Sequence, residues 1–431
     1  MLNRSEPPKG IEIKGIEFPN IEQTVLPNGC RYLYYNGGTE DICRVDLILN
    51  AGSRYQNQPL LARSAIELMP EGAGGISSSA LANHFDFYGS FLDFSYTPDY
   101  ARVTAYSLTK YLPQTLEMLE RVVKLPDYNS HEVRTWKGKG KQNLTVQMEK
   151  TYTLARQHFM RSLYGNNHPY GFSAQPNHFN SITSAKTKAF HAGHFGSAGC
   201  RILLSGRIGD AQHKLIAQAF GAEGWGAKNG IHTPIPESNP DGKRLVFVEK
   251  PQALQSAIQV GRKLFPRTHP DYPGMAVLMT LLGGYFGSRL MTNLREDKGY
   301  TYGVSSSTNF FEGGGYLSIS TEVGANHTGA ALKEIFREIE RLRTEEVGRE
   351  ELELVRNYLL GQILRNFNGP FAVANSVIGL MYYNSLDFEY FERTHQGVLG
   401  VTPNQIYNLA QKWLDPELMV QCVAGSENPF S

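Results

Sequence analysis

The sequence has no long apolar run, few cysteines and no excess of charge. No stretch of about 18 consecutive apolar residues occurs in the 431 residues, which excludes a predicted transmembrane helix. The formal net charge is +1, so bulk electrostatics favours neither nucleic acid nor an acidic membrane as a partner. Because the N-terminus lacks an apolar signal core, we expect a cytoplasmic protein without membrane insertion. An export signal removed before this start is an open alternative.

The cysteines fit no zinc spacing. There are four of them, Cys30, Cys43, Cys200 and Cys422, and they lie far apart. Cys30 and Cys43 lie on successive expected strands and could face each other, which leaves their disulfide state open. We favour free thiols in a reducing compartment.

What is present is an order of elements that occurs twice. Strand, helix, helix, hairpin, amphipathic helix and long helix are predicted in residues 21–222 and again in residues 244–431. Residues 223–243 are rich in Gly, Pro and Asn and predict a linker. Residues 1–20 contain three prolines and predict a loosely ordered N-terminal arm. Each half is therefore predicted to be α+β, with a mainly antiparallel sheet and helices packed on one side.

Local signals set some of these elements. Asn28-Gly29 between β-rich flanks predicts a hairpin turn, and alternation about Pro98-Asp99 predicts a second antiparallel pair. Helical periodicity predicts a helix around residues 61–69 and one long helix over about 131–163.

The tandem order resembles the insulinase, pitrilysin and mitochondrial processing peptidase family of zinc peptidases. The stretches that carry the resemblance include "LILNAGSRYQ", "LYGNNHPYG" and, most specifically, "SRLMTNLREDKGYTYGV". The resemblance extends from about Val25 to about Val423. It implies two homologous domains that face each other as a clamshell.

The zinc motif of that family is degenerate here. In active members, His-x-x-Glu-His on a helix holds Zn²⁺ through two imidazoles, and its Glu is the general base. The resemblance places Ser64 and Leu68 at the two His positions and Glu67 at the Glu position. A third ligand, a Glu, is expected about 75 residues later, where Glu149 is the nearest candidate. We therefore expect no metal site in this chain, with Glu67 as its remnant or as a plain exposed residue of a core helix.

The second half keeps other residues of the family pattern. An Arg and a Tyr seven residues later match Arg295 and Tyr302, which the resemblance implies reach a zinc centre. A Tyr hydroxyl and a guanidinium are suitable donors to a carbonyl oxygen. The alternative is structural, with Arg295 at a helix C-terminus and Tyr302 packed in a strand. Alternation along that strand would point Tyr300 to the same face as Tyr302.

Other motifs are weaker. His191 and His194 have no third ligand at a telling distance, and His168 is expected at a turn. Residues 283–287, "GGYFG", lie where the family's non-catalytic processing subunit has a longer glycine-rich loop. The short loop puts a gating role in doubt.

The resemblance implies a catalytically silent subunit of a heterodimeric zinc metallopeptidase. Such a chain has no cofactor of its own, closes a chamber with a zinc-bearing homologous subunit, and provides Arg295 and Tyr302 for hydrolysis of peptide or unfolded polypeptide. The alternatives are a purely structural homologue, like the core subunits of a respiratory complex, and a peptide-binding protein without a role in catalysis. A stand-alone enzyme with unconventional ligands is a further rival.

Overall fold

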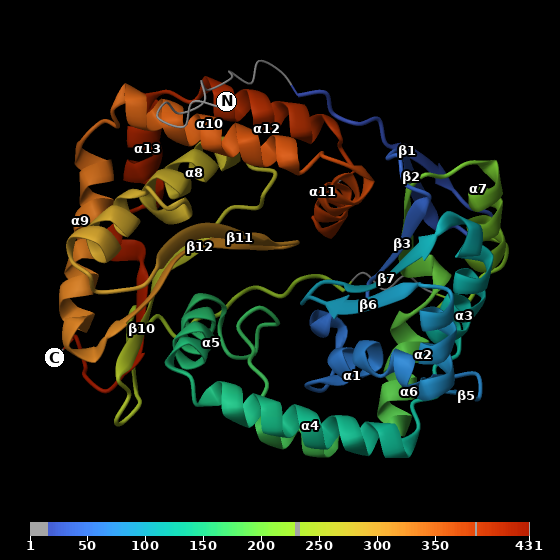
Figure 1. Cartoon of the computed structure of the whole chain (residues 1–431). Coiled ribbons are helices and arrows are strands. Elements are labelled where there is room, and N and C mark those ends of the chain that lie inside the picture. Colours follow the sequence, from blue (N-terminus) through green and yellow to red (C-terminus); the bar gives the residue numbers. More distant parts are fainter. Residues whose placement is uncertain (1–15, 229–232, 384–385, 431) are drawn as a thin grey trace, which may run out of the picture.

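The protein is a two-domain α+β structure, seen here in a computed structural model that describes residues 16–228, 233–383 and 386–430 (Figure 1). One sheet takes its strands from residues 22–206 and the other from residues 245–425. The predicted α+β class and the two tandem domains are confirmed. None of the described helices is long and apolar enough to cross a bilayer.

The first half contains β1 (Glu22–Val25), β2 (Arg31–Asn36), β3 (Ile42–Leu49), α1 (Leu61–Glu67), β4 (Gly72–Ala73), β5 (Ile76–Ser77), α2 (Ser78–Phe87), β6 (Phe91–Tyr96), β7 (Ala101–Leu108), α3 (Leu112–Lys124), α4 (Ser130–Met148), α5 (Thr151–Tyr164), α6 (Ser184–His194), β8 (Cys200–Gly206) and α7 (Asp210–Ile216). The second half contains β9 (Leu245–Glu249), β10 (Gln255–Leu264), α8 (Tyr272–Met279), the π-helical turns η7 (Thr280–Gly284) and η8 (Met291–Asp297), β11 (Val304–Phe311), β12 (Gly314–Gly324), α9 (Thr328–Thr344), α10 (Arg349–Arg365), α11 (Pro370–Tyr382), α12 (Glu389–Gly400), α13 (Pro403–Trp413) and β13 (Val420–Gly425).

The two sheets have the same strand order. The first runs β1-β2-β8-β3-β7-β6 and the second runs β9-β13-β10-β12-β11. With β1 set aside, β2, β8, β3, β7 and β6 correspond to β9, β13, β10, β12 and β11. The pairs β2–β8 and β9–β13 are parallel, and the others are antiparallel. The repeat predicted from the order of elements is therefore present.

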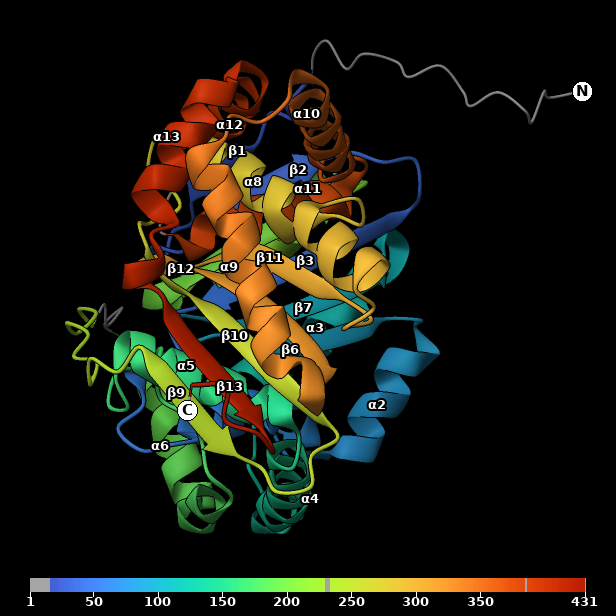
Figure 2. The same ribbon diagram turned by 90° about the vertical axis from the view of Figure 1, so that its left-hand side faces the viewer.

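Helices cover one face of each sheet as predicted. The first core joins its sheet to α1, α3 and α6, and the second joins its sheet to α8, α9 and α13. Figure 2 looks onto the helical side of the second sheet, where α9 crosses β10 and β12. Each core contains dozens of buried apolar side chains, so each sheet has a contiguous hydrophobic core of its own on this face.

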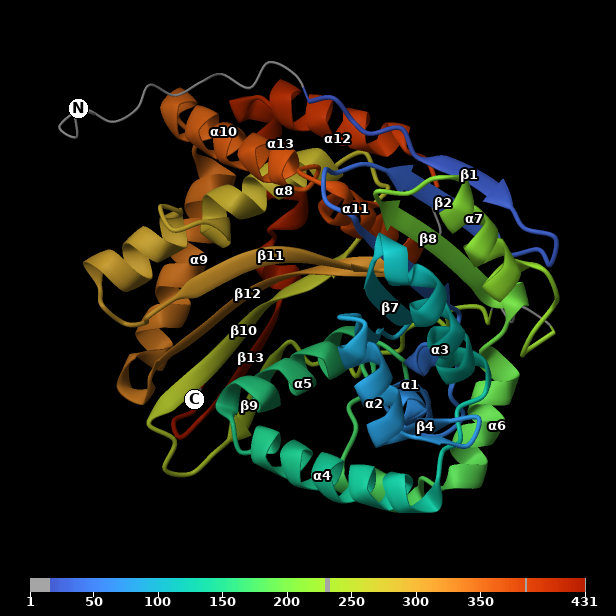
Figure 3. The same cartoon turned by 45° about the vertical axis from the view of Figure 1, so that its right-hand side comes forward.

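The second face of each sheet is covered by a helix from the opposite half. Helix α5 packs on β10 and β13 through Phe159 and Leu163, and α11 packs on β8 and β2 through Val373 and Val377 (Figure 3). This exchange buries the central strands on both faces, which explains why β3 is an almost continuous buried run. The hydrophobic periodicity of either half alone does not predict this exchange of α5 and α11.

Two expectations need correction. The single long helix over 131–163 is two helices, because Lys150 is extended (φ −85°, ψ 128°) and the chain turns between α4 and α5. No Gly or Pro marks that turn in the sequence. Within the predicted arm, residues 1–15 lie outside the described residues, and Phe18 packs edge-on against Phe367 with ring centroids 5.0 Å apart. The hairpins at Asn28-Gly29 and Pro98-Asp99 are present.

Candidate functional site

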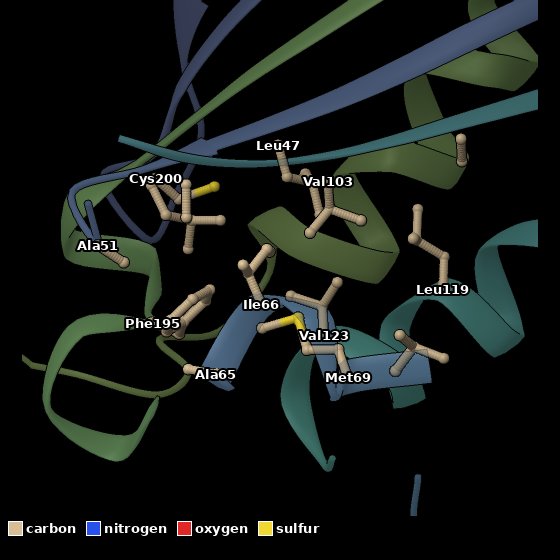
Figure 4. Packing of buried hydrophobic residues seen from close by; sticks show 14 of the residues in the cluster. Leu47, Ala51, Ala65, Ile66, Met69, Val103, Leu119, Val123, Phe195 and Cys200 are labelled. Atoms are coloured by element: carbon tan, nitrogen blue, oxygen red, sulfur yellow. The ribbon is translucent and has the colours of Figure 1, made fainter. Parts of the chain in front are cut away.

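Helix α1 lies under the first sheet with one face in the core. Ala65, Ile66 and Met69 are fully buried, and Figure 4 shows them between the sheet and α3. The helix begins after Leu60, which has φ 71°, and it gives way to a 3₁₀ turn that contains Pro70. Within α1 only Arg63 and Glu67 are not buried, so these two side chains form the accessible strip of the helix.

Neither position predicted to replace a zinc ligand faces that strip. Ser64 is completely buried; its hydroxyl donates to the Leu61 carbonyl at 2.9 Å and pairs with the Thr187 hydroxyl of α6 at 3.0 Å. Leu68 is 1% exposed and belongs to the apolar core. Ser64 and Leu68 thus join α1 to its surroundings, and side chains at these positions point away from solvent.

Glu67 is half-buried and fully engaged. Its Oε1 accepts from Nε of Arg63 at 2.8 Å, and its Oε2 accepts from the indole N–H of Trp136 on α4 at 2.7 Å. Arg63 and Glu67 are therefore the i, i+4 pair that shares the accessible strip of α1. With both oxygens taken and no imidazole beside it, this carboxylate is an ion-pair partner between α1 and α4.

The third candidate ligand lies elsewhere. Glu149 follows the last residue of α4 and forms an ion pair with Lys250 of the second domain. It is 13 residues beyond Trp136, which corresponds to roughly 20 Å along a helix. Within the described part of the chain, no three His, Cys, Asp or Glu side chains group so as to hold a metal. The residues present do not fit a zinc site.

Arg295 and Tyr302 are both on the surface of the second domain. Arg295 is an exposed residue of the π-helical turn η8, and its guanidinium carbon lies 4.8 Å from the ring centroid of Phe286. Tyr302 is 89% exposed and precedes β11. Neither side chain has a hydrogen bond or ion pair with another described residue. π-Helical turns are uncommon and recur at functional sites.

The expected alignment of Tyr300 with Tyr302 is wrong. Tyr300 stacks on His327 with ring centroids 4.6 Å apart and packs against the second core, whereas Tyr302 is in solvent. Strand alternation does not apply because β11 begins only at Val304. The environment, as well as the spacing, therefore distinguishes the two tyrosines.

The three histidines of the weaker motifs, His168, His191 and His194, pack within the first domain and its edge. Nε2 of His191 lies 2.9 Å from the Val123 carbonyl, and burial lowers the pKa of His191 to about 4, so its ring is neutral. His194 packs on Phe190, and burial lowers its pKa too. His168 is buried, with Nε2 3.0 Å from the Pro236 carbonyl.

The cysteine geometry differs from the pairing considered. Cys30 and Cys200 directly precede the paired residues Arg31 and Arg201 of β2 and β8, so they are neighbours across the sheet. A hydrogen bond from the Cys200 thiol lowers the pKa of Cys30. Cys43 instead points to the Ser107 carbonyl, and burial raises its pKa to about 11.

A buried polar cluster joins the two domains, and sequence patterns did not indicate it. Arg54 Nη2 donates to Oε2 of Glu312 at 2.8 Å, and its Nε lies 3.4 Å from Oδ1 of Asp99. The hydroxyls of Tyr100 and Tyr170 donate to Glu312 and Asp99 at 2.6 and 2.9 Å. Burial raises the pKa of Asp99. In the sequence, Arg54, Asp99 and Glu312 are each a charged residue beside a turn, and this pattern does not predict that they meet.

Known proteins share this architecture. Residues 181–359 match the family described as the Peptidase M16 inactive domain. An uncharacterized zinc protease of Bacillus subtilis, YmxG, is 22% identical over 353 residues, covering 80% of this chain and 84% of that protein. An uncharacterized zinc protease of Rickettsia felis is 22% identical over 358 residues, covering 80% and 83%.

Two solved structures have the same fold. A peptidase M16 inactive domain from Pseudomonas fluorescens superposes with a TM-score of 0.86 at 23% identity, covering 95% of this chain and 98% of that one. A protease from Helicobacter pylori superposes with a TM-score of 0.84 at 17% identity, covering 94% and 99%. The fold is therefore the two-domain fold of these two structures. This chain therefore contains the M16 inactive domain, at residues 181–359, and is homologous to uncharacterized zinc proteases.

Proposed function

We propose that this chain is the catalytically silent subunit of a heterodimeric zinc metallopeptidase. The observation that carries the proposal is the contrast between the two halves. On α1, buried Ser64 and Leu68 and the ion-paired Glu67 provide no zinc ligands. In the second domain, Arg295 and Tyr302 are exposed and make no hydrogen bonds with described residues. In this proposal zinc is held only by a homologous partner subunit.

The second domain would provide donors to the partner's site. When the partner closes around a peptide, the Tyr302 hydroxyl donates to the substrate carbonyl oxygen, which becomes negative as hydrolysis proceeds. Arg295 binds peptide carbonyls through its fork of N–H donors. Phe286 beneath the guanidinium would hold it in place, because cation–π contact restrains an otherwise mobile side chain.

The test mixes this chain with the zinc-bearing homologue encoded in the same genome and measures peptide hydrolysis. Tyr302→Phe should leave folding and association intact and lower turnover by about 10²-fold or more, as loss of one oxyanion donor does. Arg295→Ala should weaken both substrate binding and turnover. Tyr407→Phe on the outer helix α13 and Arg337→Ala on α9 are the matched controls and should change neither.

Each rival predicts a different result. A purely structural subunit or a peptide-binding protein would show unchanged kinetics for both mutants, and the chain would be no more than a wall of the chamber. A stand-alone enzyme would contain about one zinc per chain and cleave peptides without the partner, with chelator-sensitive activity. Failure of the two chains to associate at all would contradict the proposal directly.

A further inference from the structure

A cavity lies among α8, α10, α11 and α12 of the second domain, away from Arg295 and Tyr302. Its volume is about 390 Å³, within the range of small-molecule sites. Most of its wall is apolar, with Leu359, Ile363 and Phe391 among the lining residues. Phe18, just ahead of the first sheet, also lines it. The shape and composition therefore suit an organic ligand with an apolar body.

One cationic side chain, Arg267, lines this cavity, and three tyrosine rings surround its guanidinium. The guanidinium carbon of Arg267 lies 5.1 Å from the ring centroid of Tyr272, 5.3 Å from that of Tyr383 and 5.9 Å from that of Tyr390. Its Nε donates to the Tyr390 hydroxyl at 2.9 Å, and Nη1 donates to the Tyr383 hydroxyl at 3.4 Å. These contacts fix the plane of the guanidinium.

Arg267 lacks a counter-charge. Among the described residues, no carboxylate forms an ion pair with it and none forms a hydrogen bond with its Nη2. A half-buried charge that meets only rings and hydroxyls remains poorly compensated, because tyrosine hydroxyls replace only part of its hydration. A planar fork held by aromatic rings is also prearranged for a two-oxygen anion.

A second polar group lines the same cavity. The carboxamide of Gln362 on α10 has no hydrogen bond with any described residue. Ser376 is different, since its hydroxyl already donates to the carbonyls of Asn366 and Ala372. The cavity is thus lined by one cation, by polar groups that include the uncommitted carboxamide of Gln362, and by a larger number of apolar side chains.

We propose that this cavity binds a small organic carboxylate, with the carboxylate on Arg267 and the apolar body among the helices. A single guanidinium balances one negative charge, which favours a monocarboxylate over a phosphate that carries nearly two. The carboxylate belongs either to a free acid or to the C-terminus of a short peptide. This inference does not depend on a partner subunit.

The experiment uses the full chain and titrates decanoate against its neutral counterpart decanol by calorimetry. Decanoate should bind with a dissociation constant of about 1 mM or tighter, and decanol should bind at least about tenfold more weakly. Arg267→Gln should raise the dissociation constant of decanoate about tenfold or more, as loss of a charged hydrogen bond does. A second pair, a tripeptide with a free C-terminus and its C-terminal amide, distinguishes the two sources of carboxylate.

A cavity-filling variant keeps the test independent of Arg267. Gly379 on α11 lines the cavity, and a Cβ placed there meets no atom within 4 Å, so Gly379→Leu should fill the space and abolish binding. Gly361 on α10 is equally open but does not line the cavity, so Gly361→Leu should bind as the wild type does. Circular dichroism checks that each variant is folded.

Selective binding of either carboxylate over its neutral counterpart, lost in Gly379→Leu and retained in Gly361→Leu, would support the proposal. It would be overturned if neither carboxylate binds, if decanol binds as well as decanoate, or if Arg267→Gln leaves the affinity unchanged.

Discussion

The two halves of the chain have one strand order but treat the helix after the first long strand differently. In the first half, that helix is α1, and its accessible strip holds an Arg63–Glu67 ion pair against α4. In the second half, the helix is α8, and two π-helical turns follow it. The second of these contains exposed Arg295, and exposed Tyr302 lies shortly after it. The same scaffold therefore engages its accessible polar side chains in an ion pair in one copy and leaves them exposed in the other.

The exchange of α5 and α11 makes the two copies depend on each other. Each sheet needs a helix from the other half to cover its second face, so neither half buries its sheet alone. A buried group of polar contacts between the domains lies at the tip of the β11–β12 hairpin, where Glu312 meets Arg54 and Asp99. The joint between the copies is therefore both apolar and ionic.

The largest expected effect comes from breaking that joint. Arg54→Ala removes the guanidinium that Asp99 and Glu312 share, whose carboxylate side chains are only 5% and 8% exposed. Removing one member of a buried ion pair costs about 3–5 kcal/mol, and we expect that loss in the free energy of urea unfolding. Arg337→Ala, in an exposed pair, should cost less than about 1 kcal/mol. A loss that small for Arg54→Ala would contradict the role of the cluster.

The next effect tests which face of α1 is available for a metal. Ser64→His with Leu68→His places two imidazoles in the core, and we expect about 3–4 kcal/mol of destabilisation with no metal binding. Arg63→His with Glu67→His places them on the accessible strip at the spacing that holds a metal on one helix face. This second variant should fold and bind Ni²⁺, measured by calorimetry. Metal binding by the first variant instead would refute the assignment of faces.

These contrasts show how far the sequence could lead. The repeat, the sheet class and the hairpins follow from local signals, such as Asn28-Gly29, that need no partner to be recognised. The orientation of α1 does not follow from local signals. A serine at position 64 could equally face solvent or form a hydrogen bond inside the core, as Ser64 does with Thr187, 123 positions away. Apolar Leu68 fits the core on its own, but the resemblance placed it at the position of a zinc-ligand His.

Long-range partners explain the other gaps. Neither the turn at Lys150 nor the exchange of α5 has a local signal, since both depend on a sheet formed from residues beyond 245. The cluster of Arg54, Asp99 and Glu312 likewise brings together three turns that are remote in sequence. The roles of Arg295 and Tyr302 stay a prediction, for which exposure is a necessary condition.

The third effect concerns the pH dependence of stability, to which the two halves contribute differently. His191 of α6 is buried and neutral with a pKa of about 4, whereas the matching position of α13 is Ala410. The unfolded chain gains a proton on His191 below about pH 6.5, and the folded chain does so only near pH 4. Stability should therefore fall as the pH decreases from about 6.5 to 4, by up to about 3 kcal/mol from this group.

His191→Gln keeps a donor for the Val123 carbonyl and removes the titration, so it should flatten this part of the pH profile. The exposed His131→Gln should leave the slope unchanged. Urea unfolding at several pH values measures both. An unaltered slope in His191→Gln would show that other groups cause the acid sensitivity.

The smallest effect asks whether the two copies begin a matching helix in the same way. Thr183 caps α6 by accepting from the Lys186 N–H at 3.3 Å, and Thr402 caps α13 by accepting from the Gln405 N–H at 3.2 Å. Thr183→Ala and Thr402→Ala should each cost about 1 kcal/mol of unfolding free energy. Only the second copy adds a return bond, from the Thr402 N–H to the Gln405 side chain at 2.9 Å.

The hydrogen bond from the Thr402 N–H to the Gln405 side chain allows the most detailed comparison of the N-terminal caps of α6 and α13. Gln405→Ala removes it and should cost about 0.5 kcal/mol, whereas Lys186→Ala at the matching position of α6 removes no such bond. Lys186 also donates to Gln58 and to the Ser181 carbonyl. The loss of these exposed hydrogen bonds is therefore the largest destabilisation that we expect from the control variant Lys186→Ala. Equal losses for the two Thr variants, with a further loss only for Gln405→Ala, would mean that the copies share one helix start and differ by a single added hydrogen bond. A cap that matters in only one copy would mean that packing around α6 and α13, rather than the shared threonine, decides where each helix begins.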